Sequence, residues 1–225
     1  MRVVTLSGWG QPHDALAAIA PEAYHIDYAK HDNVQNALAE IAEHKSDIVI
    51  GWSLGGQLAV RAMAARAFTP SKLVLIATPF QFVTMPDKPL GMGRDTYRKF
   101  RNNYAKTPER TLNKAWELIY HGDKNADRVR AHLEKNDKKL ALEKNWLFWL
   151  DALDGYSLHG EDLNYLPPTL LLHGDKDAVV AMEQSDLFAR AIPQAKTVIF
   201  AGAGHAPHWH DTELVRRHIR DFANV

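Results

Sequence analysis

The sequence predicts an α/β fold with a mostly parallel, doubly wound sheet and a helical insertion. Short apolar runs rich in β-branched residues alternate with helical patterns through the first 80 residues, and such alternation is typical of parallel sheets. From about residue 81 to residue 163 no buried strand is expected, and helical patterns follow one another. We therefore predict a first core part (1–80), a helical cap insertion (81–165) and a second core part (166–225).

About six strands are expected, because six short segments are apolar or alternate in polarity. They are residues 3–6, 24–28, 48–50, 72–77, 168–173 and 197–200. Core helices are predicted over 13–19, 34–44, 57–66, 182–191 and 212–222. The insertion is predicted to hold helices over 94–104, 108–121, 125–136 and 140–153. An insertion of this length is too long to be a loop in a compact domain.

The strand at 48–50 runs into Gly51-Trp52-Ser53-Leu54-Gly55, a G-x-S-x-G pattern, and a helical pattern follows directly. A strand, a sharp turn and a helix are the context in which this pattern forms a nucleophile elbow. The serine at the tip must adopt a strained backbone conformation, and its neighbours two positions away must be small. We therefore predict Ser53 as a nucleophile. The alternative is a glycine-rich connection with a chance serine.

The composition is that of an ordinary globular protein of 225 residues with a formal net charge of zero. No overall field favours nucleic acid or a membrane surface, so neither is expected as a partner. Cysteine is absent, which excludes disulfides, thiol catalysis and cysteine-ligated zinc. There is no signal-peptide pattern at the start and no apolar run of membrane-spanning length. We expect a cytoplasmic protein without a cofactor or metal.

A serine nucleophile needs a base, and the base needs an acid that fixes its tautomer. In an elbow fold these follow the serine in chain order, on loops at the carboxyl ends of later strands. Asp177 follows the strand at 168–173, and His205 follows the strand at 197–200. Ser53, Asp177 and His205 are therefore the predicted catalytic triad.

Each partner of the serine has a competitor nearby in the chain. Asp175 shares the loop of Asp177, and an Asp beside Gly often only forms a turn. His208 and His210 follow His205 closely, and the three could be proposed as a metal site. That spacing matches no common metal motif. Packing or surface positions are favoured for the two later histidines.

Acyl transfer passes through an oxyanion, which requires preplaced backbone donors. One predicted donor is the N–H of Leu54, directly after the nucleophile. The second is the N–H of Trp9, in the loop Ser7-Gly8-Trp9-Gly10 after the first strand. Trp9 is also a candidate core aromatic.

The catalytic motifs resemble those of α/β-hydrolases, and specifically the pimeloyl-acyl-carrier-protein methyl ester esterases of biotin synthesis. The matching residues are Gly8-Trp9-Gly10, 51–56, 173–177 and Gly204-His205, with cap stretches 100–122, 149–154 and 161–163. The match places the acid at the end of His-Gly-x-x-Asp, which is Asp177. Two features depart from the family: Ser7 replaces a histidine, and the leading antiparallel strands are missing. The strand at 24–28 should then lie at a sheet edge.

The resemblance implies a serine carboxylesterase that acts on a small acyl ester presented by acyl carrier protein. Trp52 and Trp9 would line the acyl channel. Basic cap residues hold the acidic carrier protein in this family, and the match assigns that role to Arg110 and Lys114, with Arg128 in the next basic segment. The segment from Arg94 to Lys144, including Lys138 and Lys139, holds more bases than acids. A solvated basic face is the alternative for it. For the chain, the alternatives are a general short-chain esterase and a catalytically inactive binding protein.

Overall fold

A six-stranded parallel sheet forms the centre of the protein. The structure is a computed structural model that describes residues 1–65, 68–136 and 142–224. The strands lie in the order β2-β1-β3-β4-β5-β6, and every pairing is parallel. They are β1 (Val3–Leu6), β2 (Tyr24–His25), β3 (Ile48–Trp52), β4 (Lys72–Ile76), β5 (Thr169–Gly174) and β6 (Ala195–Phe200). The predicted parallel α/β fold is confirmed.

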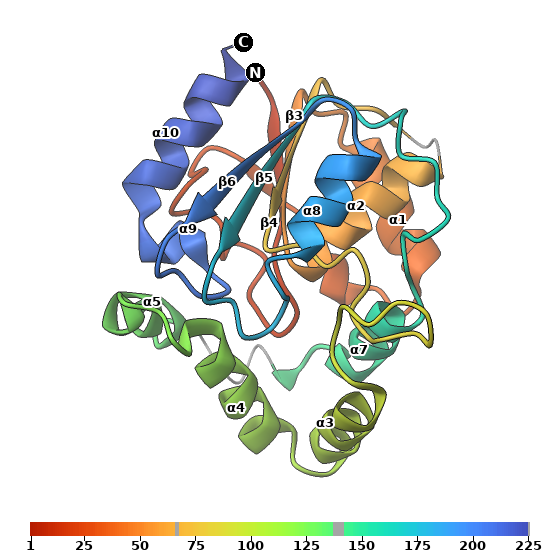
Figure 1. Ribbon diagram of the computed structural model, residues 1–225, viewed down its shortest axis with the longest axis vertical. Coiled ribbons are helices and arrows are strands. Elements are labelled where there is room, and N and C mark those ends of the chain that lie inside the picture. Colours follow the sequence, from red (N-terminus) through yellow and green to blue (C-terminus); the bar gives the residue numbers. More distant parts are fainter. Residues whose placement is uncertain (66–67, 137–141, 225) are drawn as a thin grey trace.

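Helices cover both faces of the sheet (Figure 1). On one side lie α1 (Val34–Glu43), α2 (Leu54–Ala64) and α8 (Gln184–Ala191), and on the other lies α10 (Thr212–Ala223). The inner strands β3, β4 and β5 are almost fully buried because both faces are covered. This accounts for their continuous apolar sequences, which differ from the alternating pattern of a half-exposed strand.

The predicted helix at 13–19 is wrong. These residues form successive turns, in which Ala15, Ala17 and Ile19 donate backbone hydrogen bonds to the carbonyls three residues earlier. A segment this short has few internal bonds to offset the cost of helix nucleation. The apolar side chains of Leu16 and Ile19 are still buried, so the apolar pattern indicated burial rather than a helix.

The strand predicted at 24–28 is shorter than expected. Only Tyr24 and His25 pair with β1, and Tyr28–Lys30 form a short 3-10 helix (η1). Within the described part of the chain, β2 has no partner on its outer side, which confirms the predicted edge position. The Nδ1 atom of His25 lies 2.6 Å from Thr5 Oγ1, so one polar side chain of this edge is tied to the neighbouring strand.

The helical insertion lies between β4 and β5, at the carboxyl end of the sheet (Figure 1). In its described residues the helices are α3 (Arg94–Lys106), α4 (Pro108–Tyr120), α5 (Ala126–Leu133) and α7 (Trp146–Asp154). Of the helix predicted over 140–153, the described residues show α7 from Trp146, and residues 143–145 before it are not helical. Residues 66 and 138–141, which belong to predicted helices or to the basic segment, lie outside the described residues. The division at 81 and 165 remains a prediction.

Indole groups tie this insertion to the core. Trp9 Nε1 donates to the carbonyl of Trp146 over 2.8 Å, and Trp116 Nε1 donates to the carbonyl of Gly10 over 3.2 Å. Both bonds join cap helices to the loop after β1, which sequence analysis assigned to the oxyanion site. The cap therefore covers the end of the sheet where the predicted site residues lie. None of the helices in the described residues has the length and apolarity that crossing a bilayer requires.

Candidate active site

Ser53 lies at a strained turn between β3 and α2. Its backbone angles are φ 53° and ψ −120°, in a region that residues other than glycine rarely adopt. A side chain at Gly51 would come within 2.4 Å of the Gly56 Cα atom, and one at Gly55 within 2.2 Å of the Leu6 carbonyl oxygen. The turn therefore needs glycine on both sides of the serine, as the G-x-S-x-G pattern indicated.

Asp177, and not Asp175, faces the ring of His205. The distance from Asp177 Oδ2 to His205 Nδ1 is 2.8 Å, and both side chains are almost completely buried. Asp177 Oδ1 accepts hydrogen bonds from the backbone N–H groups of Val179 (2.8 Å) and Val180 (2.9 Å). Asp175 instead accepts from the N–H of Gly202 over 2.6 Å and joins the loop after β5 to the loop after β6.

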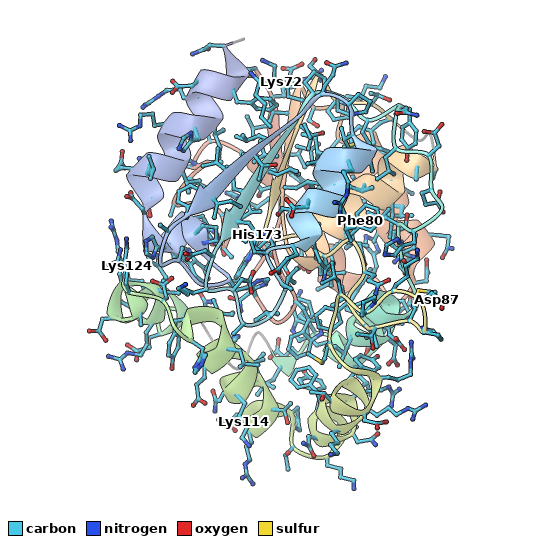
Figure 2. The ribbon with its side chains drawn as sticks, in the orientation of Figure 1. Lys72, Phe80, Asp87, Lys114, Lys124 and His173 are labelled. Atoms are coloured by element: carbon cyan, nitrogen blue, oxygen red, sulfur yellow. The ribbon has the colours of Figure 1, made fainter. Side chains whose placement is uncertain are left out.

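His173 is a site residue that the sequence analysis quoted in a motif without giving it a role. It lies at the end of β5 (Figure 2), and its Nε2 atom is 3.0 Å from Asp177 Oδ2. Its Nδ1 atom is held at 2.7 Å from Ser185 Oγ. Burial alone would raise the pKa of Asp177, but the contacts with His205 and His173 lower it below the ordinary value. Asp177 is thus held as a carboxylate that can orient His205.

Ser53 and His205 line the same cavity, although no hydrogen bond joins the Ser53 hydroxyl to the His205 ring in the described structure. Catalytic hydrogen bonds are often long in unliganded enzymes and tighten when substrate binds. The cavity also includes Gly8 and Trp9 from the loop after β1. The N–H groups of Trp9 and Leu54 donate to no other group of the described protein. Both are therefore available to an oxyanion.

The cavity is narrow and apolar, with a volume of about 60 Å³. Trp9, Trp52, Ser53 and His205 form its core side, and apolar side chains from the cap close it. These are Met92, Phe100, Ala115, Trp116, Leu118, Ile119, Leu150 and Leu153. No Asp, Glu, Lys or Arg of the described residues lines it. The arrangement suits an uncharged reacting group that is shielded from water.

Comparison with known proteins agrees with this geometry. A model of the alpha/beta hydrolase family matches residues 2–217. The chain belongs to this family. A pimeloyl-[acyl-carrier protein] methyl ester esterase of Nitrosomonas europaea is 33% identical in an alignment of 165 positions that covers 71% of this chain and 64% of that protein. A biotin biosynthesis bifunctional protein BioHC of Cellvibrio japonicus is 27% identical, over 78% of this chain and 35% of that protein.

The chain thus spans slightly less than two thirds of the first of these relatives and about a third of the second. Among solved structures, an esterase from Exiguobacterium antarcticum aligns with a TM-score of 0.81 at 17% identity, covering 100% of this chain and 92% of that one. A bromoperoxidase from Bacillus anthracis gives 0.80 at 19% identity, covering 100% and 92%. At identities of 17% and 19%, these two alignments show a shared fold and no more than that.

Trp52 and Trp9 each combine a place on the cavity wall with a structural contact. Trp52 Nε1 donates to the carbonyl of His205 over 2.9 Å, and its ring packs edge-on against His208 and Trp209. The indole of Trp9 contacts Phe100 and Trp146 of the cap. Trp9 is only partly buried, and Trp52 is fully buried. Their role in substrate binding remains a prediction.

The three predicted carrier-binding residues of this α/β-hydrolase lie on the cap surface, away from the cavity. Arg110, Lys114 and Arg128 are exposed, and none of them forms an ion pair with a described residue. Figure 2 shows Lys114 on α4 pointing away from the sheet. Neighbouring cations such as Arg101 and Arg130 are instead paired with cap aspartates. The three residues can therefore meet an acidic partner without first breaking an internal pair.

His205, His208 and His210 do not act as one cluster. The Nδ1 atom of His210 lies 2.6 Å from Asp123 Oδ1, so His210 and His205 face different carboxylates. His208 is fully buried, and neither of its ring nitrogens has a hydrogen-bond partner among the described residues. Burial lowers the pKa of His208 well below its ordinary value, and the neighbouring His205 and His132 lower it further.

Proposed function

We propose that this α/β-hydrolase is a serine carboxylesterase. One observation carries the proposal: Ser53 occupies a strained elbow and shares an apolar cavity with His205, whose ring is held by the buried Asp177. The esterase named among its relatives supports the same reaction class. Strain at a residue that packing alone would not require is typical of a functional position.

The reaction would proceed by acyl transfer through Ser53. His205 Nε2 takes the hydroxyl proton while Ser53 Oγ attacks the ester carbonyl, and Asp177 stabilises the imidazolium. The N–H groups of Leu54 and Trp9 donate to the oxyanion. The tetrahedral intermediate collapses, and His205 gives its proton to the departing alkoxide, which leaves as the alcohol. Water, deprotonated by His205, then hydrolyses the acyl-enzyme and restores Ser53.

For the substrate, we infer a pimeloyl methyl ester carried by acyl carrier protein. The relative from N. europaea bears the name of that activity. An uncharged methyl ester suits the apolar cavity, whereas the carrier protein is acidic and suits the cap. Between Arg94 and Lys144 the sequence holds 14 Lys and Arg residues against 8 Asp and Glu residues. Complementary charge raises the rate of encounter and fixes the orientation of the partners.

A general short-chain esterase is the second candidate, and the size of the cavity favours it. A volume of about 60 Å³ is small for a ligand site, since ligand pockets usually measure about 300–1,000 Å³. A seven-carbon chain needs more room and therefore requires the cap side chains to move. A small ester such as an acetate needs less rearrangement.

Two experiments test the proposal. Labelling with a fluorophosphonate probe should modify wild type at Ser53, and Ser53→Ala should remain unlabelled while it keeps the fold. Absence of labelling in wild type would favour an inactive binding protein. Complementation of a biotin auxotroph that lacks its pimeloyl ester esterase then separates the two substrates: growth supports the carrier-bound ester, and failure of an active, expressed enzyme supports the general esterase.

A further inference from the structure

The cap contacts the loop that carries His205 at the turn between α4 and α5. Three backbone donors are involved. The N–H of His205 donates to the carbonyl of Ile119 over 3.0 Å, and the N–H of Lys124 donates to the carbonyl of Gly202 over 2.9 Å. The N–H of Gly204 donates to the side chain of Asp123 over 2.7 Å. The consecutive N–H groups of Gly204 and His205 are therefore both satisfied by the cap.

Asp123 is the centre of this contact. Its side chain is fully buried, and both carboxylate oxygens accept hydrogen bonds. Oδ2 accepts from Gly204, while Oδ1 accepts from the backbone N–H of Asn125 over 2.7 Å and lies 2.6 Å from His210 Nδ1. A buried carboxylate is stable only when its charge is compensated in this way. The loop of His205 therefore supplies the donors that stabilise the buried Asp123 carboxylate, and Asp123 in turn fixes the position of that loop.

His210 completes the contact on the other side of His205. It ends α9 (Pro207–His210) and is itself buried. The amide nitrogen of Asn125 donates to the carbonyl of His210 over 3.2 Å and lies 3.4 Å from its Nε2 atom. An Nε2 atom that accepts a hydrogen bond leaves the proton on Nδ1, where it meets Asp123. The cap thus holds the chain at Gly204 and again at His210.

We propose that Asp123, with His210, is a positioning pair for His205. Asp123 does not line the cavity that holds Ser53, so it acts through the backbone of the histidine loop and not on the substrate. It fixes the loop on both sides of His205 and keeps the ring aligned between Asp177 and Ser53. The catalytic role of His205 is part of the proposed function, and this inference rests on it.

The turn between α4 and α5 is thus hydrogen-bonded to the loop that carries the triad histidine. Asp123 and Ile119 belong to the cap, whereas Gly204, His205 and His210 belong to the core. Displacement of the turn between α4 and α5 would remove both acceptors from the N–H groups of Gly204 and His205. Misplacement of a catalytic group by about 1 Å can cost on the order of 10²-fold in rate. Triad geometry should therefore depend on a seated cap turn.

Asp123→Ala tests the pair directly. We expect kcat for a small ester such as p-nitrophenyl acetate to fall 10- to 100-fold, with KM changed by less than about threefold, because the cavity is untouched. Asp123→Asn keeps one side-chain oxygen for the N–H of Gly204 and should recover part of the loss. Asp127→Ala is the matched control, since Asp127 is an exposed aspartate on α5 that pairs only with Arg130 among the described residues. It should retain wild-type kinetics.

Two readouts separate this inference from the proposed function. The first is the rate of fluorophosphonate labelling, and the second is the low-field proton resonance of the His205 Nδ1–H group, which does not require a substrate. Slower labelling with a shifted or broadened resonance in the variants supports the pair. Equal labelling rates and an unchanged resonance in Asp123→Ala and wild type would overturn it while leaving the esterase intact. An unlabelled wild type defeats the proposed function, and the resonance alone then decides on the pair.

If Asp123→Ala does not fold, as judged by circular dichroism, the comparison passes to Asp123→Asn and His210→Gln. Each of these variants changes one member of the pair and keeps a side-chain oxygen at position 123 that can accept from the N–H of Gly204. A lower kcat with a shifted resonance in either folded variant supports the inference. Wild-type values in both overturn it.

Discussion

Backbone strain at Ser53 should be measurable as stability. A non-glycine residue in this conformation costs on the order of 1–3 kcal/mol, whereas glycine adopts it freely. Glycine also gains more entropy in the unfolded chain, which offsets about 0.4–1 kcal/mol of the benefit. We expect Ser53→Gly to be more stable than Ser53→Ala by about 1 kcal/mol. Both variants lack the nucleophile, so chemical denaturation compares them without interference from activity. A more stable Ala variant would contradict the strain argument.

The two aspartates of one loop should differ sharply in their effect on catalysis. Asp177→Asn should lower kcat by roughly 10⁴-fold, because the amide no longer holds the required tautomer of His205. Asp175→Asn keeps an oxygen that accepts from the N–H of Gly202, so kcat should stay within a few-fold of wild type. Steady-state kinetics on one ester compares the pair. Equal losses would mean that the loop tolerates neither change and that the assignment of the acid is undecided by kinetics.

At the scale of elements, the segment from Gly202 to Asp211 places three histidines in three environments. His205 faces the cavity, His208 packs under Trp52 and Trp209, and His210 contacts Asp123. The short helix α9 produces this separation, because it turns successive side chains in different directions. The segment thus contains the predicted base, His205, and also contributes His208 and His210 to the buried interior.

His208 should make the fold sensitive to mild acid. Its pKa is lowered in the folded state by burial, whereas in the unfolded chain it titrates near 6.5. Below that value the unfolded state binds more protons, so stability falls as the pH falls. If His208 stays neutral in the folded state, the free energy of unfolding should fall by about 2 kcal/mol between pH 7 and pH 5. His208→Leu should remove that part of the pH dependence.

Urea denaturation of both proteins at several pH values measures this difference. His121 is exposed at the end of α4, and His121→Leu serves as the matched control. That variant should reproduce the wild-type curve of stability against pH. Parallel curves for wild type and His208→Leu would show that His208 takes up a proton in the folded state.

At the scale of the whole molecule, charge and chemistry occupy different regions. The net charge is zero, yet exposed cations lie on the cap and the cavity beneath it is apolar. Each exposed ion pair contributes about 1 kcal/mol or less, so several cap residues must act together on a partner. A carrier protein would therefore be held by the surface of the cap, and its ester would react some distance away at Ser53.

Reversal of two cap charges tests this separation. Arg110→Glu combined with Lys114→Glu should lower kcat/KM for a carrier-protein ester by about tenfold, given the size of exposed pairs. Added salt should reduce wild-type kcat/KM in the same direction, because screening acts beyond roughly 8 Å at physiological ionic strength. Hydrolysis of p-nitrophenyl acetate should change little.

The control for charge reversal is Lys196→Glu combined with Arg217→Glu. Both residues are exposed and lie on β6 and α10, outside the cap. The net charge changes equally, so a loss confined to the cap variant assigns the effect to the cap surface. Equal losses on both substrates in the cap variant would mean that Arg110 and Lys114 are structural. No loss on either would favour the general esterase.

The sequence by itself determined those features that depend on neighbours in the chain. Apolar, β-branched runs indicated the inner strands β3, β4 and β5, since such segments are buried between helices, and shorter or alternating runs indicated the other three strands. The glycines around Ser53 indicated the elbow, because the turn is a local steric requirement. The chain order of Ser53, Asp177 and His205 followed from their places after the carboxyl ends of β3, β5 and β6. The prediction of a helix at 13–19 was wrong, because the apolar residues of this segment are buried although the backbone forms turns.

Only the tertiary structure decided which groups meet across long separations in sequence. The family resemblance favoured Asp177 over Asp175, but only the fold brings His173 and His205 to the Asp177 carboxylate. Asp123 and His210 are 87 residues apart, and no local signal links them. Burial of His208 likewise depends on Trp52 and Trp209, which the fold brings to it. Periodicity reports on contacts within one element, whereas packing between elements sets the partners and charge state of a buried polar group.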